Sequence, residues 1–440
     1  DPRNNIDGAW TTSYSGINRS IRLIDNAKAS DLSDDKKALF IAEGRAMRAW
    51  YYLVLWKTWG NIPFYEENLT SLPYLADQLT VDQVYEKVVV DLESVLDSEV
   101  LPMKQPDEWA GRMTQAAASM IYADYVMYQK DQSRYGKALG YMKAIINSHK
   151  YDLVKNYNDL YALDKEWNEE IIFDVNYIAK GGKRTWGDAN FTGGTVYPEM
   201  IGIDGLTIKC AEGHTPEFTS GWGFGSVSKE VYDAFEDNDR RRDVAILNLD
   251  KYARAKFAEG DTVTYGGRYQ NTGYFLRKYL PRPGDTEGSV GDAGLNHDEN
   301  LHLYRYAETL LNAAELALAT GDGLAQDYFD LVRERAGVAS IPVTMDNIIN
   351  ERRLEFVGEG KRYFDLVRSG KAATVLKAGA GVLLRTKRTY NFDKNQWEGE
   401  NTWGGQAIPE RVDWTENKKY IPIPQSEIEA AQGSITQNPY

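Results

Sequence analysis

Apolar side chains recur at helical spacing through the first third of the chain. Between Ser33, a candidate N-cap, and Gly60, a candidate stop, they lie three and four residues apart. Thr80 and Gln83 form a capping-box pattern before another apolar stripe, and the Ala- and Tyr-rich stretch 113–148 continues the periodicity. These patterns predict helices arranged in antiparallel pairs.

The helical spacing returns after residue 300. A helix there is predicted to place on one face Tyr304, Ala307, Leu311, Ala314 and Leu318. The next helix is predicted to end at Gly337. Since each pair leaves one face uncovered, neighbouring pairs stack as tetratricopeptide-like units do. We therefore expect a mainly α fold, with a scaffold over approximately 10–155 and 300–378.

Two stretches lack helical periodicity, approximately 156–300 and 379–416. They are rich in Gly and aromatic residues, and the first contains one alternating strand pattern, formed by Ile171, Phe173, Val175 and Tyr177. Long irregular loops on a rigid frame are where binding sites tend to lie. The sequence thus predicts a loop-rich, few-stranded ligand region inserted into a helical scaffold.

Charge and composition exclude several classes of protein. The net charge of -14 repels phosphate backbones, so nucleic acid is not an expected partner. A single cysteine, Cys210, excludes an internal disulfide and a multi-thiolate zinc site, and the four histidines show no ligand spacing. No apolar run reaches the roughly 18 to 20 residues of a membrane-spanning helix. Any membrane attachment is expected upstream of Asp1.

The segment "ERRLEFVGEGKRYFDLVRSG", Glu351–Gly370, combines charges of both signs with aromatics and glycines. On a continuous helix its glutamates would form a like-charged row that basic groups must answer. Gly358 and Gly360 would each cost about 1 kcal/mol inside a helix. We therefore predict two short helices that meet at a corner and are tied to their neighbours by ion pairs, as a structural joint and not a catalytic centre.

Four segments in a fixed order carry a family resemblance. They are "IAEGRAMRAWYYLVLWKTWGNIPFYEE", "YRYAETLLNAAELAL" with "VRERAGV", "INERRLEFVGEGKRYFDLVRSG", and "YIPIPQSEI" with "TQNPY". Together they resemble the SusD/RagB family of outer-membrane nutrient-binding lipoproteins over nearly the whole chain. The resemblance implies one SusD-like domain of residues 1–440, a glycan ligand, cell-surface exposure at the outer membrane, and a SusC-type TonB-dependent transporter as partner.

The resemblance also implies an N-terminal lipid anchor. "IDGAWTTSYSGINRSIRLIDNA" is similar to a family segment that normally follows several dozen residues, which hold the lipidated cysteine, the first helix and often part of the ligand site. That anchor segment is absent from this chain. Membrane attachment and some ligand contacts are therefore expected outside it.

Candidate ligand contacts follow from the chemistry of sugars. A pyranose ring packs its C–H face on an aromatic ring, while its hydroxyls need donors and acceptors. Glycine-flanked loops that combine such residues supply the predicted ligand-binding set: Trp186, Trp222, Arg184, Asn190, Arg268, Tyr269 and Asn271. Each loop tryptophan is equally consistent with a ring tucked under its own loop, and "GGRYQNTGYF" is also consistent with a hairpin edge.

The other tryptophans fall into two groups. Trp50, Trp56 and Trp59 lie in a predicted helix and are assigned to core packing. Three more are in the second irregular stretch, where ligand platform and transporter-facing surface are both open: Trp397, Trp403 and Trp414.

Catalysis has weaker support from the sequence. A glycosidase needs two carboxylates at a set separation, and no motif distinguishes such a pair. We expect no catalytic residues and no cofactor, although "DTEGSVGD", Asp285–Asp292, offers oxygens that suit a structural calcium ion. Non-catalytic glycan capture and delivery is the leading hypothesis; a polysaccharide-active hydrolase and a tetratricopeptide-type peptide-binding scaffold are the alternatives.

Overall fold

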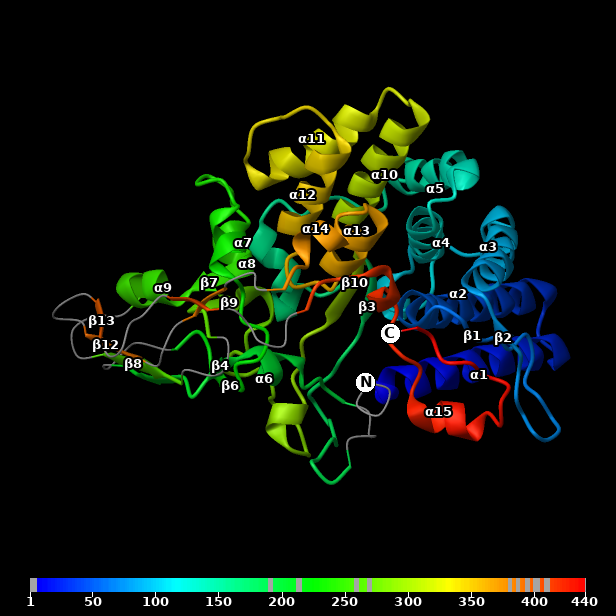
Figure 1. Cartoon of the computed structure of the whole chain (residues 1–440), viewed down its shortest axis with the longest axis horizontal. Coiled ribbons are helices and arrows are strands. Elements are labelled where there is room, and N and C mark those ends of the chain that lie inside the picture. Colours follow the sequence, from blue (N-terminus) through cyan, green and yellow to red (C-terminus); the bar gives the residue numbers. More distant parts are fainter. Residues whose placement is uncertain are drawn as a thin grey trace.

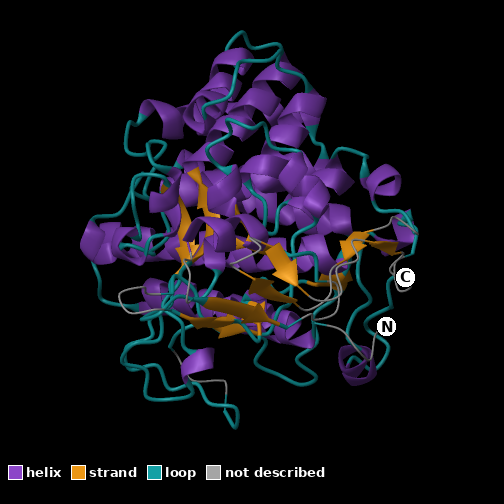
Figure 2. Ribbon diagram, turned by 90° about the vertical axis from the view of Figure 1, so that its left-hand side faces the viewer, coloured by secondary structure: helices purple, strands orange, loops and turns teal. Residues whose placement is uncertain are grey.

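The computed structural model describes most of the chain, in ten stretches. These are residues 6–188, 193–210, 216–256, 261–266, 271–378, 382–384, 388–391, 396–398, 404–406 and 412–439. Helices dominate; many of the short strands lie together on the left of Figure 1, while others lie among the helices (Figures 1 and 2). The mainly α fold predicted from the sequence is therefore confirmed.

The scaffold consists of the longer helices. They are α1 (Asp7–Ala29), α2 (Asp34–Trp59), α3 (Val81–Asp97), α4 (Gln115–Gln129), α5 (Tyr135–Asn147), α10 (Tyr306–Thr320), α11 (Ala325–Ala336), α12 (Met345–Glu355) and α13 (Arg362–Arg368). Each of the helices α1 to α5 packs on the next, and α10 packs on both α11 and α12. Helix α10 also packs on α5, which joins the early and late parts of the scaffold. No described helix is both long and apolar enough to cross a bilayer.

The remaining helices are short and most lie in the insertion. They are α6 (Tyr197–Ile201), α7 (Lys229–Asp233), α8 (Arg242–Ala245), α9 (Leu249–Lys256), α14 (Ala372–Val375) and α15 (Gln425–Ala430). In Figure 1, α6 to α9 lie beside the strands, while α14 lies near α13 and α15 lies beside α1.

Short strands form one four-stranded sheet and several pairs. The sheet has the order β13 (Gln396–Glu398), β12 (Arg388–Asn391), β8 (Thr262–Tyr265), β5 (Thr207–Lys209). The antiparallel pairs are β1 (Ile62–Pro63) with β2 (Gln78–Leu79), β3 (Ile171–Val175) with β10 (Leu301–Arg305), β7 (Ile246–Asn248) with β9 (Tyr274–Leu276), and β11 (Val382–Leu384) with β14 (Gly404–Gln406). A parallel pair joins β4 (Ile203–Asp204) to β6 (Ser220–Gly221).

Local signals place several helix ends correctly. Thr80 and Gln83 form the predicted capping box of α3, and α11 ends at Gly337, whose φ is 79°. Helix α2 stops at Trp59, before Gly60, as expected. Ser33 occupies the N-cap of α2, but its side chain makes no capping hydrogen bond.

Two predictions about the β3–β10 pair are wrong. Tyr304 lies in β10, where it pairs with Phe173 of β3, and is not on the helical face, because α10 begins only at Tyr306. The alternating pattern ends at Val175, so Tyr177 lies beyond β3, and both faces of the strand are buried. Packing against β10 and α4 buries residues that alternation assigned to solvent.

The scaffold tryptophans are core residues, as predicted. The side chains of Trp56 and Trp59 are fully buried. Trp50 is half-buried, and its ring meets the edges of Phe173 and Tyr304 at centroid separations of 5.6 and 5.8 Å. These three tryptophans therefore serve packing of the scaffold.

The joint, residues Glu351–Gly370, has the predicted corner. Helix α12 ends at Glu355 and α13 begins at Arg362, with Gly358 and Gly360 between them at φ values of 80° and 74°. A Cβ on Gly358 would lie 2.3 Å from the side chain of Leu276, whereas one on Gly360 would meet nothing within 4 Å. Only glycine therefore allows this corner to approach β9.

Arginines from distant elements form ion pairs with the glutamates of the joint. Arg305, 1% exposed, pairs with Glu355 at 3.0 Å and with Glu359 at 2.9 Å. Arg241 pairs with Glu351 at 2.6 Å and with Glu355 at 3.0 Å. Further ion pairs join Arg333 to Glu351, Arg335 to Glu355 and Lys278 to Glu359. Glu170 pairs with two of these arginines, Arg305 and Arg335. The joint is thus tied to β10, α11 and the insertion through buried charges, as a structural element.

Candidate functional site

Three aromatic rings meet at the surface of the insertion. The rings of Trp186 and Trp222 have centroids 5.5 Å apart and planes inclined by 37°. Phe224 stands nearly perpendicular to Trp222, at a centroid separation of 6.2 Å. Trp186 is 67% exposed and Phe224 is 44% exposed, while Trp222 is half-buried between them. These three residues form what we call the aromatic platform.

Main-chain hydrogen bonds hold the Trp222 side of the platform. The N–H of Trp222 donates to the carbonyl oxygen of Glu199 at 2.8 Å, and the N–H of Phe224 donates to that of Met200 at 2.9 Å. The parallel β4–β6 pair leads directly into this loop. The backbone of α6 and the segment after it therefore places both rings, whatever side chains the loop carries.

Four polar side chains hold the Trp186 side of the platform. Each accepts a hydrogen bond from a backbone N–H of the 177–186 loop. Asp292 accepts from Trp186 at 2.8 Å, Asn296 from Arg184 at 3.4 Å, Asp298 from Ala179 at 2.5 Å, and Asn300 from Tyr177 at 2.8 Å. We call these four residues, in the segment 292–300, the polar ladder. It satisfies backbone donors that a loop cannot satisfy alone.

Close packing fixes the ladder against the loop. The Asn296 side chain is fully buried and also donates to the carbonyl oxygens of Arg184, at 3.0 Å, and Asp292, at 2.8 Å. A Cβ on Gly182 would lie 2.5 Å from the Asn296 amide oxygen. The tryptophan is therefore exposed on a loop whose backbone is firmly bound.

The structure brings some of the predicted ligand contacts together and not others. Trp186 and Trp222 meet, whereas the guanidinium of Arg184 lies 5.9 Å from the centre of the Tyr177 ring. Asn190, Arg268 and Tyr269 lie outside the described residues.

Asn271, another predicted ligand contact, lies inside the fold. It is 4% exposed, and its side-chain oxygen accepts a hydrogen bond from the N–H of Gly273 at 3.0 Å. The side chain of Asn271 thus closes a turn, and its contact with a ligand stays an untested prediction.

Comparison with known proteins decides the family. The model of the SusD family matches residues 169–440, and a model described as starch-binding associating with outer membrane matches residues 2–124. The chain belongs to the SusD family.

Solved structures and a curated relative support this assignment. Surface glycan-binding protein A from Bacteroides thetaiotaomicron, in complex with laminarihexaose, is 40% identical, with a TM-score of 0.84 over 100% of this chain and 87% of the other. A laminarin binding SusD-like protein is 28% identical, with a TM-score of 0.81 and coverage of 100% and 87%. A SusD-like protein of Bacteroides ovatus is 24% identical over 419 residues, 90% of this chain and 69% of its own length.

The sequence analysis missed part of this candidate site. Phe224 has a visible signal, the Gly-Trp-Gly-Phe-Gly run at 221–225, which brings a second aromatic into the same tight loop. The polar ladder has a weaker one, an alternation of Asp and Asn in "DAGLNHDEN". Neither pattern reveals which backbone it binds.

The tryptophans of the second irregular stretch remain apart from the platform or undescribed. Trp414 donates from its indole N–H to the Tyr363 hydroxyl at 3.3 Å, which places it against the joint. Trp403 lies outside the described residues, and only the backbone of Trp397 is described.

The acidic loop predicted to suit calcium uses its carboxylates for the backbone. Asp285 accepts from the N–H of Arg282 at 2.6 Å, and Asp292 belongs to the polar ladder. Among the described residues, no three His, Cys, Asp or Glu side chains are grouped to hold a metal ion. A structural calcium ion stays an untested prediction.

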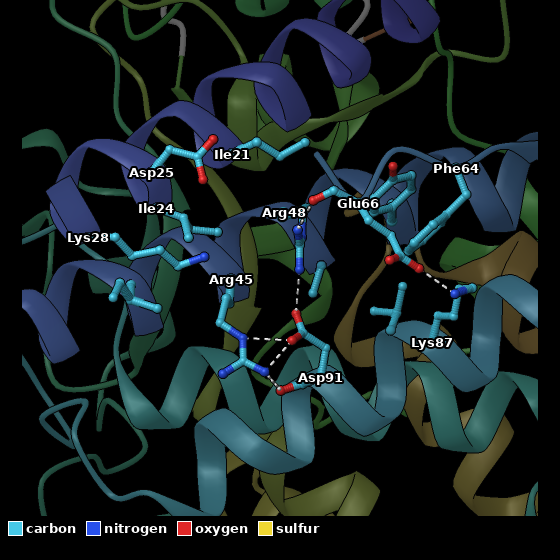
Figure 3. A pocket seen from close by; sticks show the side chains of 14 residues that line it. Ile21, Ile24, Asp25, Lys28, Arg45, Arg48, Phe64, Glu66, Lys87 and Asp91 are labelled. Carbon is cyan, nitrogen blue, oxygen red and sulfur yellow. Dashed lines mark hydrogen bonds and ion pairs between the residues drawn. The ribbon is translucent and has the colours of Figure 1, made fainter. Parts of the chain in front are cut away.

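A hollow of about 420 Å³ lies in the scaffold among α1, α2 and α3 (Figure 3). Its charged groups largely bind one another. Arg48 donates to Asp91 at 2.9 Å, Arg45 also binds Asp91, and Lys87 pairs with Glu66. Phe64, the aromatic ring that Figure 3 labels, is half-buried. The hollow thus differs from the platform, where large rings face solvent.

Proposed function

We propose that this SusD-family protein captures an oligosaccharide without cleaving it, by stacking sugar rings on the aromatic platform. The observation that carries the proposal is Trp186, which is 67% exposed although its backbone is bound by the polar ladder. Exposing so large an apolar ring on a firmly held loop has a cost that a ligand relieves.

The platform chemistry suits carbohydrate. Apolar C–H faces of two neighbouring sugar rings can lie on Trp186 and Trp222, whose centroids are 5.5 Å apart. Each stacked ring contributes on the order of 1 kcal/mol, so binding in the micromolar range or weaker is expected. The planes of the two tryptophan rings are inclined by 37°. This inclination favours a glycan in which each sugar ring is rotated relative to the next, and disfavours a flat chain.

Named relatives supply the first ligand to test. One is described in complex with laminarihexaose and another as laminarin binding. A glucose oligosaccharide of this kind is therefore our proposed ligand class.

A non-catalytic role is supported by the use of the nearby carboxylates. Asp292 and Asp298 both accept backbone hydrogen bonds at the base of the platform. A glycosidase needs an acid and a base that flank the scissile bond and are free to exchange protons. Carboxylates held in the polar ladder serve structure and do not meet that need.

We also propose that the captured glycan passes to a SusC-type transporter at the outer membrane. The description of the family model over residues 2–124, starch-binding associating with outer membrane, supports the location. The family resemblance supports the partner. Co-purification with the transporter encoded for the same system tests this step separately from glycan binding.

Calorimetry with laminarihexaose tests the glycan proposal. We expect Trp186→Ala and Trp222→Ala each to weaken binding about tenfold. Trp109→Ala is the matched control, because Trp109 is 52% exposed but lies on the scaffold side, and it should bind like the parent. Equal binding by all variants, or new reducing ends produced from the glycan, contradicts the proposal.

A further inference from the structure

A buried carboxylate without partners lies inside the polar ladder segment. Glu299, between Asp298 and Asn300, is 6% exposed. Neither of its carboxylate oxygens has a hydrogen-bond partner among the described residues. Its neighbours on either side each bind a backbone N–H of the loop that carries Trp186. The segment that carries the ladder thus combines hydrogen-bonded side chains with Glu299, which has no such partner among the described residues.

The groups around Glu299 do not favour its charge. Burial raises its pKa well above the usual range; Arg282 opposes the shift, while Asp285 and Glu166 add to it. The hydroxyl of Tyr279 is also buried without a hydrogen-bond partner among the described residues, and Nε2 of His297 lies 3.5 Å from a carboxylate oxygen of Glu199. Tyr197 also lies near, since burial and then Glu299 raise the pKa of that phenol. The surroundings of Glu299 therefore favour its protonated form more than water does.

We propose that a proton on Glu299 keeps the polar ladder in the position that supports the aromatic platform, so that glycan affinity falls as the pH rises. This inference rests on the proposed function, because glycan affinity is the quantity measured, and it adds regulation of the same site by pH. A buried, unpaired carboxylate is strongly unfavourable and must gain water or a partner when it ionises.

The route from Glu299 to the platform is short along the chain. Water that reaches an ionised Glu299 has to displace the backbone of residues 298–300. Asp298 and Asn300 then lose their bonds to Ala179 and Tyr177, at the start of the loop that ends in Trp186. The Trp186 ring would lose its fixed position beside Trp222.

The direction of the effect follows from the sign of the shift. A carboxyl whose folded-state pKa is raised favours the native arrangement at low pH and opposes it as the pH passes through that raised pKa. Glu166 is a second carboxyl that titrates in this region, since burial, with Asp298 and Asp174, raises its pKa to about 7, so the test has to separate the two groups. A neutral glucose oligosaccharide has no group that titrates in this range. Any change in affinity between pH 5.5 and 9 thus reports on the protein.

Binding of laminarihexaose across that pH range is the test. The parent should lose about tenfold in affinity, the size of a one-unit pKa difference between free and bound protein. Glu299→Gln, which has the shape of the protonated acid, should stay within about twofold. Glu287→Gln is the matched control on the exposed side of the neighbouring loop and should follow the parent. A flat parent profile, or a Glu299→Gln profile parallel to the parent, overturns the proposal.

Two further measurements separate the possible causes of failure. Glu166→Gln should retain a pH-dependent affinity; a flat profile in this variant assigns the switch to Glu166 and overturns the role of Glu299. Without any glycan, hydrogen exchange of amides 177–186, corrected for the intrinsic rate, should accelerate with pH in the parent but not in Glu299→Gln. Loss of that difference overturns the proton switch, whereas its presence without glycan binding overturns only the proposed function.

Discussion

Buried carboxylates occur both in the joint and in the segment that carries the polar ladder, but their surroundings differ. Glu351, Glu355 and Glu359 of the joint each pair with one or more arginine or lysine side chains. The carboxylate oxygens of Glu299 have no hydrogen-bond partner among the described residues, and the charges of Asp285 and Glu166 oppose that of Arg282 in their effect on it. Paired charges fix one geometry over a wide pH range, whereas an unpaired acid ties geometry to its proton. The joint is therefore expected to keep one arrangement over a wide pH range, whereas the proposed switch at Glu299 would respond to pH.

The two regions also divide recognition from function. The joint carries the residues that identify the family, yet its glutamates are almost entirely buried. The platform residues lie in loops without a distinctive motif, and two of the three rings are exposed. A family signature in such a protein reports how the chain folds, and the ligand must be sought elsewhere.

The largest expected effect comes from removing the central cation of the joint. Arg305→Met removes the one cation among the described residues that pairs with all three of Glu355, Glu359 and Glu170, which should cost about 3 to 5 kcal/mol in the free energy of unfolding. Urea denaturation measures it. Lys87→Met, which removes one member of an exposed pair, should cost less than about 1 kcal/mol. Similar losses in both variants would show that burial does not distinguish the pairs.

Acid should affect the joint before the platform. Burial raises the pKa of Glu359, but Arg305 and Lys278 more than offset this and lower it to about 2. A lowered folded-state pKa contributes stability that is present near pH 5 and is lost as the pH falls toward 2. For this group the loss amounts to about 3 kcal/mol. Unfolding free energies measured from pH 5 to pH 2.5 should show the decline, and a flat profile would contradict it.

Two neighbouring glycines of the joint should differ in their tolerance of a methyl group. Gly358→Ala places a Cβ 2.3 Å from Leu276, so it should cost about 2 kcal/mol more than Gly360→Ala. Gly360→Ala suffers only from its positive φ, about 1 kcal/mol. Thermal unfolding of both variants, with laminarihexaose affinity as a second measurement, checks the order. Equal costs would mean that the Leu276 side chain moves to make room for the added methyl group.

The smallest effect is expected at the edge of the platform. Phe224→Ala removes a ring that stands perpendicular to Trp222, so it offers a sugar an edge and not a face. Laminarihexaose affinity should fall only about two- to threefold, the equivalent of about 0.5 kcal/mol. A loss as large as that of Trp186→Ala would show that all three rings bind the ligand equally.

Local patterns predict much of the scaffold because local interactions determine it. The Thr80 capping box and the Gly337 stop depend on residues within one turn, and the structure has both. Tyr304 fails because its helical spacing competes with a strand partner, Phe173, more than a hundred positions away in the chain. Periodicity contains no information about such a partner.

The site could be predicted only in part for the same reason. Trp186 and Trp222 are suggested by the glycines around them, and the structure brings them together. The polar ladder joins residues 106 to 123 positions apart in the chain. Its members look like an ordinary polar loop until the fold supplies the backbone that they bind.

Main-chain bonding of the Trp222 loop has a practical consequence for engineering. The bonds from Trp222 and Phe224 to Glu199 and Met200 use only backbone atoms, so they do not depend on the side chains at 222 and 224. A library that varies these two positions, while the glycines between and around them are retained, should remain folded in most of its members. Selection from such a library could redirect the protein toward other glycans without redesign of its scaffold.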